Sequence, residues 1–171
     1  MSFTFKETEE KIKKYYDSLR VLGQLKHRLE VYRGRKENIE RKIENSAIKL
    51  EDNFKAVSYD EVGGGSGNIK VSPQERAVDK AFFILERNLE EVKGEMLLIE
   101  EQISGIEADN ADMEYILKDM DSEYVNILES LYKYKKGSLA TSINYNMDRV
   151  TVYRKKDKVI NEVMKWLNFY N

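Results

Sequence analysis

Two long stretches of the chain carry apolar residues at alternating steps of three and four, with charged residues between them. The first runs from about residue 7 to 54 and the second from 73 to 120. This spacing is close to the 3.5-residue period of a coiled coil and predicts two long helices, each with one buried stripe. The stripe of the first consists of Ile12, Tyr15, Leu19, Leu22, Leu25, Leu29, Tyr32, Ile39, Ile43, Ala47, Leu50 and Phe54. The stripe of the second consists of Val78, Phe82, Leu85, Leu89, Val92, Met96, Ile99, Ile103, Ile106, Asn110, Met113, Leu117 and Met120.

The connection between the two stretches, residues 55–72, contains the run Gly63-Gly64-Gly65-Ser66-Gly67, which is typical of a flexible linker. It lacks the Gly-Lys-Ser/Thr sequence of a phosphate-binding loop. Pro73 suits the first position of the second helix. Asn110 is the one polar residue in the second stripe, and two interpretations stay open for it: a partly solvated position, or a residue that sets the register of the helices.

Equal stripe lengths and a single connection favour an antiparallel helical hairpin, although a connection of this length also allows pairing between chains. Because two helices alone make a thin core, a homo-oligomer is expected, with a dimer favoured. Residues 1–120 are therefore interpreted as two long helices that oligomerise.

The last stretch, residues 121–171, has a different character. It holds nine Lys and Arg residues against six Asp and Glu, whereas the preceding 120 residues hold twenty against twenty-five. Three helices are predicted there, capped by Asp121 or Ser122, by Ser138 and by Asp148. The second is short, and a turn at residues 144–146 separates it from the third. A short helix, a turn and a helix with a basic first half are the arrangement of a helix-turn-helix DNA-binding domain.

The exposed side of the third helix is expected to bind double-stranded DNA. Arginine can hold guanine with two hydrogen bonds, and lysine neutralises phosphates. Tyr153 has two open interpretations, contact with DNA or packing against the hairpin. The predicted DNA-binding residues are Arg149, Thr151, Tyr153, Arg154, Lys155, Lys156 and Lys158.

The same segment resembles a known family through the runs Ser122-Glu123-Tyr124-Val125-Asn126-Ile127-Leu128, Gly137-Ser138-Leu139, Thr151-Val152-Tyr153-Arg154 and Trp166-Leu167. These residues are similar to sigma-70 region 4-like helix-turn-helix domains, in particular those of phage-encoded transcriptional regulators of the ArpU and RinA type. The resemblance implies that Thr151–Arg154 begins the recognition helix, with Asp148 in place of the usual Ser cap. It also implies a possible contact with RNA polymerase.

Composition limits the other functions. The chain has no Cys and one His, so thiolate or multi-histidine metal sites are not expected, and no cofactor is expected either. The acidic pairs lie on the wet side of the long helices, which argues against an enzyme. No apolar run approaches the length of a membrane span, and the first residues lack the apolar core of a signal peptide, so a cytoplasmic location is expected.

The sequence therefore predicts an all-α protein, a long antiparallel hairpin followed by a small helix-turn-helix domain, that regulates transcription in a phage or prophage. Two alternatives of different class stay open. One is the small terminase subunit, a DNA-packaging protein that also joins a helix-turn-helix to a coiled coil. The other is a non-enzymatic coiled-coil scaffold.

Overall fold

A computed structural model of the chain describes residues 2–57 and 73–170, and the side chains of residues 2–45 and 76–169. The described residues are helical almost throughout and contain no strand, which confirms the predicted all-α class. The elements are α1 (Phe5–Val57), α2 (Pro73–Lys118), α3 (Ser122–Leu128), the π-helical turn η1 (Glu129–Lys133), α4 (Ser138–Asn144) and α5 (Arg149–Tyr170).

The two long helices follow the predicted ranges closely, and α2 begins at the predicted Pro73. α1 ends three residues beyond the predicted end of the first stretch, and α2 ends two residues before the predicted end of the second. Most of the predicted glycine-rich connection lies outside the described residues. None of the helices in the described part of the chain contains a stretch long and apolar enough to span a membrane.

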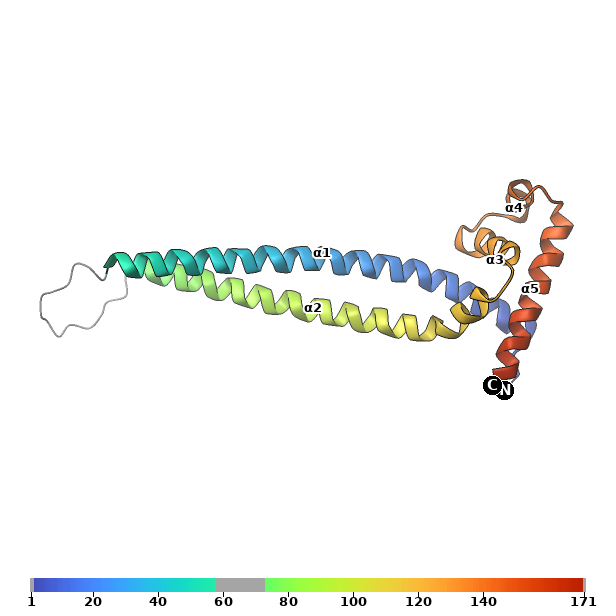
Figure 1. Cartoon of the computed structure of the whole chain (residues 1–171), viewed down its shortest axis with the longest axis horizontal. Coiled ribbons are helices and arrows are strands. Elements are labelled where there is room, and N and C mark those ends of the chain that lie inside the picture. Colours follow the sequence, from blue (N-terminus) through green and yellow to red (C-terminus); the bar gives the residue numbers. More distant parts are fainter. Residues whose placement is uncertain (1, 58–72, 171) are drawn as a thin grey trace, which may run out of the picture. The chain divides into compact units, whose positions relative to one another are not determined.

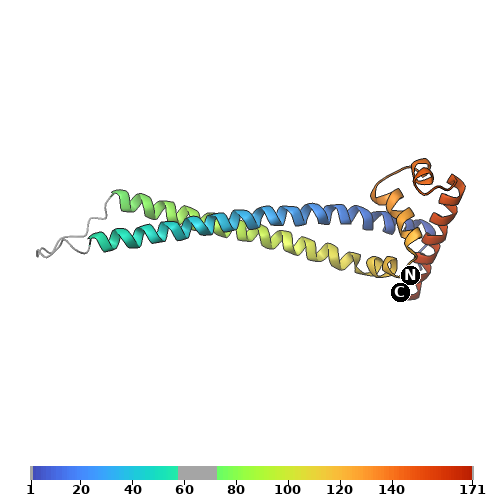
Figure 2. The same ribbon diagram turned by 45° about the horizontal axis from the view of Figure 1, so that its top comes forward.

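The chain divides into two compact units, which differ from the predicted division at residue 120. The first unit comprises Met1–Leu25 and Gln102–Asn171, and the second comprises Lys26–Glu101. Each unit contains a segment of α1 and a segment of α2. Within each unit the two segments lie side by side and run in opposite directions (Figure 1), and the turned view agrees (Figure 2). Pairing within one chain replaces the alternative of pairing between chains.

The predicted stripes lie at the contact between the two helices. The buried members include Leu25 and Ile103 in the first unit, and Leu29 and Ile99 in the second. The other stripe residues of the second unit whose side chains are described, within 26–45 and 76–101, are half-buried, as expected where only two helices meet. Near the start of α1 the more deeply buried tyrosine is Tyr16, next to the predicted Tyr15.

The core of the first unit explains why it extends beyond residues 121–171. Val159, Ile160 and Val163 of α5 are fully buried in one cluster with Ile12 of α1 and Ile116 of α2. The apolar side of α5 is therefore covered by the long helices as well as by α3. Removing the helix-turn-helix segment would expose this cluster to water, so the segment and the adjoining ends of α1 and α2 form one unit.

Asn110 is buried in the first unit, with 7% of its surface exposed. Its amide Oδ1 accepts a hydrogen bond of 2.9 Å from Ser18 Oγ on α1. Its Nδ2 is buried and has no hydrogen-bond partner among the described residues. The partly solvated interpretation is wrong, since the side chain is covered. A buried polar pair that joins the two helices fits the alternative, a position that aligns them.

Candidate nucleic-acid interface

The helix-turn-helix segment consists of α4, a turn at residues 145–148, and α5. α3 and η1 precede it and pack against it: a buried hydrogen bond of 2.9 Å joins Ser130 of η1 to Thr141 of α4. The turn includes Asn146 with a φ of 49°, a left-handed conformation that Asn tolerates better than most residues. This turn separates two helices, as the sequence predicts, but it begins one residue later than predicted, because Asn144 belongs to α4.

Asp148 caps α5, as predicted. Its carboxylate accepts hydrogen bonds from the Thr151 backbone N–H at 3.0 Å and from Thr151 Oγ1 at 2.7 Å. These two bonds, the side-chain bond first, lower the pKa of Asp148 below its ordinary value, with a smaller contribution from the positive charge of Arg154. Thr151 is half-buried and occupied with this cap, so its hydroxyl serves the start of the helix. Asp121 caps α3 in the same way, through a 3.0 Å bond from the Glu123 N–H.

The start of α4 differs from the prediction. Gly137, in extended backbone, occupies the cap position, and no side chain caps this helix. The left-handed residue before it is Lys135, with a φ of 52°, and its ammonium lies 3.0 Å from Asp17 of α1. Ser138 is the first residue of α4 instead of its cap, which leaves its hydroxyl available to α5.

Four exposed residues define the outward face of the first two turns of α5: Arg149, Val150, Tyr153 and Arg154. They stand at spacings of one and four, which place them on one side of a helix. Val150 is 58% exposed and Tyr153 47% exposed. Tyr153 therefore does not pack against the hairpin. Val150 is not among the residues predicted to bind DNA, because an apolar residue two positions from the buried Val152 resembles a core residue.

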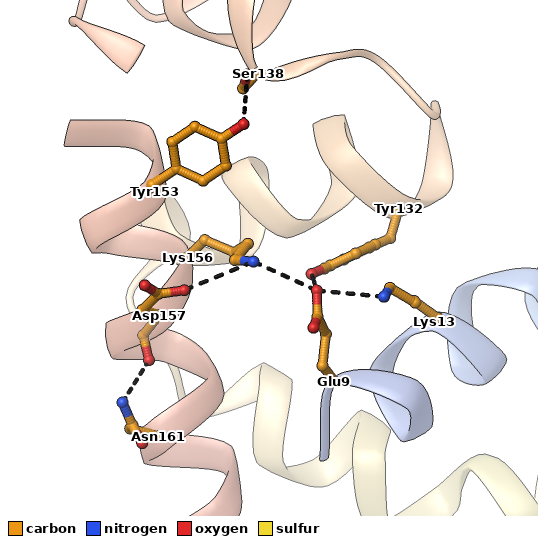
Figure 3. Close-up of polar contacts among 8 residues, drawn as sticks. All are labelled: Glu9, Lys13, Tyr132, Ser138, Tyr153, Lys156, Asp157 and Asn161. Atoms are coloured by element: carbon orange, nitrogen blue, oxygen red, sulfur yellow. Dashed lines mark hydrogen bonds and ion pairs between the residues drawn. The ribbon is translucent and has the colours of Figure 1, made fainter. Parts of the chain in front are cut away.

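Ser138 joins the two helices on this face. Its Oγ accepts a hydrogen bond of 3.1 Å from Tyr153 Oη (Figure 3). It accepts a second one of 3.3 Å from Arg149 Nη2. The bond with Ser138 and the nearby Arg149 lower the pKa of the Tyr153 phenol. The hydroxyl thus fixes two side chains at the point where α4 and α5 meet.

The three predicted lysines lie at the flank of this face, and each contacts another element. Lys155 forms an ion pair with Glu123 of α3, and Lys158 donates a 2.7 Å hydrogen bond to Tyr124 Oη. Lys156 Nζ lies 3.4 Å from Glu9 Oε1 of α1 and 3.6 Å from Asp157, and its side chain is only 18% exposed. The expectation that all of these lysines stand on the exposed side is therefore wrong for Lys155 and Lys156. Both face the neighbouring helices, because α5 packs against them through this flank.

Glu9 is the centre of the contacts around Lys156. Its carboxylate accepts a 2.7 Å hydrogen bond from Tyr132 Oη of η1. It also forms ion pairs with Lys13 of α1 at 3.3 Å and with Lys156 of α5 at 3.4 Å, and Figure 3 shows all three contacts. Partial burial would raise the pKa of Glu9, but the Tyr132 bond and the two ammonium groups outweigh it and lower the pKa. Burial, then the bond to Glu9, raises the pKa of Tyr132 above its ordinary value. This cluster attaches α5 to α1 directly beneath the outward face.

Comparisons of this chain with protein families, with curated proteins and with solved structures found no match.

Proposed function

We propose that this protein is a sequence-specific double-stranded-DNA-binding regulator of transcription, of phage or prophage origin, and that α5 is its recognition helix. The observation that carries the proposal is the outward face of α5, where two arginines flank two exposed side chains in the first two turns. These are the turns of a recognition helix that enter the major groove. The residues that resemble the sigma-type domain, Thr151–Arg154, lie at the same place.

The side chains on this face suit different parts of a base pair. Arg149 and Arg154 each have a guanidinium that can donate two hydrogen bonds to the O6 and N7 of guanine. Val150 offers an apolar surface of the kind that packs on a thymine methyl group. Tyr153, held by Ser138, has a fixed ring between the arginines. Asp157 lies one turn further on and carries a negative charge, which favours a short contact confined to the start of α5.

The lysines receive a different role from the one that the sequence suggests. Lys156 is largely covered and pairs with Glu9, and Lys155, which is half-buried, pairs with Glu123. These two ammonium groups attach α5 to α1 and α3, so they position the recognition helix. Lys158, exposed at the flank, is the lysine of the three that is best placed to meet a phosphate.

A selection from random duplexes tests the proposal. The full-length protein is expected to enrich a short motif that contains guanine, and an Arg154→Ala variant is expected to lose preference at one guanine position. The matched control is Arg41→Ala, which removes the same charge from an exposed position of α1. Its motif should equal that of the wild type. If the duplexes that the wild-type protein retains at low salt show no enriched motif, the proposal is contradicted.

A further inference from the structure

The hydroxyl group of Ser138 connects α4 to the outward face of α5. Ser138 is the first residue of α4, and Gly137 holds the cap position of this helix. The Ser138 Oγ therefore does not cap its own helix. It lies 3.1 Å from Tyr153 Oη, as Figure 3 shows. It also lies 3.3 Å from Arg149 Nη2. One residue of α4 thus holds two side chains that stand one turn apart on α5.

Arg149 keeps its charge and most of its hydrogen-bond donors in this arrangement. Among the described residues it forms no ion pair with a carboxylate, so its contacts are with the neutral hydroxyl groups of Ser138 and Tyr153. A guanidinium has five N–H donors, and the bond to Ser138 occupies one of them. The donors that remain suffice for the two hydrogen bonds to guanine. The contact with Ser138 therefore orders Arg149 without preventing it from binding a base.

Arg154, the second arginine of the outward face, is not held in this way. It is exposed, and it forms no hydrogen bond or ion pair with another residue of the described part of the chain. Ordering a long side chain on binding costs free energy. Arg154 loses its freedom only when it binds, whereas folding has already ordered Arg149. The two arginines of one face therefore differ in how far they are prepared for a base.

From these contacts we infer that Ser138 is a positioning residue for DNA recognition: its hydroxyl holds the guanidinium of Arg149 in one orientation and so increases the preference of Arg149 for guanine. The inference rests on the proposed function, because it concerns how α5 reads a base. An arginine held in place presents its donors to the O6 and N7 of guanine, whereas a freely rotating one turns to other acceptors as well. Since Ser138 contacts Arg149 and not Arg154, the guanine that Arg154 binds should not depend on it.

Affinities of the full-length protein for three duplexes test the inference. The first duplex carries the motif that the wild type selects. In the other two, adenine replaces the guanine that Arg149 or Arg154 contacts, and selections with Arg149→Ala and Arg154→Ala identify these two positions. Ser138→Ala is expected to lose about 2- to 10-fold of the preference for guanine at the Arg149 position, which is the cost of ordering one long side chain on binding. The preference at the Arg154 position should stay unchanged.

Two further variants separate the hydroxyl from the rest of the side chain. Ser138→Thr keeps the hydroxyl and should retain the preference of the wild type at both positions. The matched control is Ser122→Ala, the same change at the exposed first residue of α3, and it should also behave as the wild type. Full preference of Ser138→Ala at the Arg149 position, or an equal loss at both positions, would overturn the inference. A selection in which Arg149→Ala changes no position would overturn it as well.

A measurement without DNA tests the contact itself. The bond to Ser138 is the largest cause of the lowered pKa of Tyr153, so Ser138→Ala should raise this pKa and Ser138→Thr should leave it low. Nuclear magnetic resonance of ¹³C-labelled tyrosine follows the titration, with Tyr153→Phe to assign the signal. An unchanged pKa in Ser138→Ala would overturn the inference.

The failures of the two proposals are distinguishable. If Arg154→Ala loses its guanine while Ser138→Ala changes nothing, the proposed function stands and the inference alone fails. If the wild type selects no motif, both fail. Circular dichroism checks the helix content, and Ser138→Gly, which also lacks the hydroxyl, replaces Ser138→Ala if that variant unfolds.

Discussion

Replacing Asn110 by Leu is expected to stabilise the protein, although it removes the hydrogen bond that joins α1 and α2. Asn110 is buried and makes one hydrogen bond, to Ser18, while its Nδ2 has no partner among the described residues. Loss of one hydrogen bond costs about 0.5–1.5 kcal/mol, whereas removal of an unpaired buried polar group recovers about 1–3 kcal/mol. Ser18 keeps a partner, since its single hydroxyl hydrogen can turn to the Tyr15 carbonyl oxygen, 2.7 Å from Oγ.

The larger side chain adds apolar burial. A fully buried Leu contributes about 1.5–3 kcal/mol relative to an exposed one. Accommodating the larger side chain in a packed core costs about 1–3 kcal/mol, which offsets part of this gain. Asn110→Leu should therefore raise the free energy of unfolding by about 1 kcal/mol, the net of terms of similar size. Ser18→Ala, in contrast, leaves the whole amide unpaired and should lower it by about 1–2 kcal/mol.

Urea unfolding followed by circular dichroism measures both variants. The midpoint should rise for Asn110→Leu and fall for Ser18→Ala, with the dependence on urea unchanged in both, which marks a change in stability without a change in the surface exposed. A lower midpoint for Asn110→Leu would refute the reasoning, because it would mean that the amide gains more from its surroundings than the Ser18 bond accounts for.

Two further predictions concern stability. Gly34→Ala in α1 and Gly105→Ala in α2 should each stabilise the protein by about 1 kcal/mol, because an added Cβ meets nothing within 4 Å at either site and Ala favours the helix; thermal unfolding measures this, and a lower midpoint for either variant would contradict it. Because the pKa of Glu9 is lowered in the folded protein, its contribution to stability is present above the ordinary Glu pKa and is lost as the pH falls through the lowered value. Between pH 6 and pH 3 the free energy of unfolding should thus fall less steeply for Glu9→Gln than for the wild type. Parallel curves for the two proteins would show that the Glu9 cluster contributes nothing to this pH dependence.

Much of the fold follows from local pattern. The stripes predict α1 and α2 because a long run of steps of three and four allows little else. Asp121 and Asp148 predict the starts of α3 and α5 because their carboxylates accept a backbone N–H two or three residues further on. The predicted cap of α4 was wrong, because the helix begins one residue earlier, with Gly137 at the cap position and Ser138 as its first residue. Both residues suit a cap position, so the local sequence does not distinguish them.

The candidate site was harder to predict, because it depends on contacts between distant parts of the chain. Lys156 belongs to a basic run, and only the fold brings Glu9, 147 residues away, to its ammonium group. The same packing turns Lys155 toward Glu123 and leaves Val150 outside. A sequence pattern gives the period of α5 but not which flank its neighbours cover, and that choice decides which cations are exposed.

The most direct test of the central claim is a binding titration of Arg154→Ala on the selected duplex and on a random duplex, at several salt concentrations. If α5 reads bases, the variant should lose about 1–3 kcal/mol, or about 5- to 150-fold, in affinity for the selected duplex and much less for the random one. Arg41→Ala, which removes the same charge from α1, should bind the selected duplex as the wild type does. Equal affinities of Arg154→Ala and the wild type for the selected duplex, with native circular dichroism, would contradict the assignment of α5 as a recognition helix.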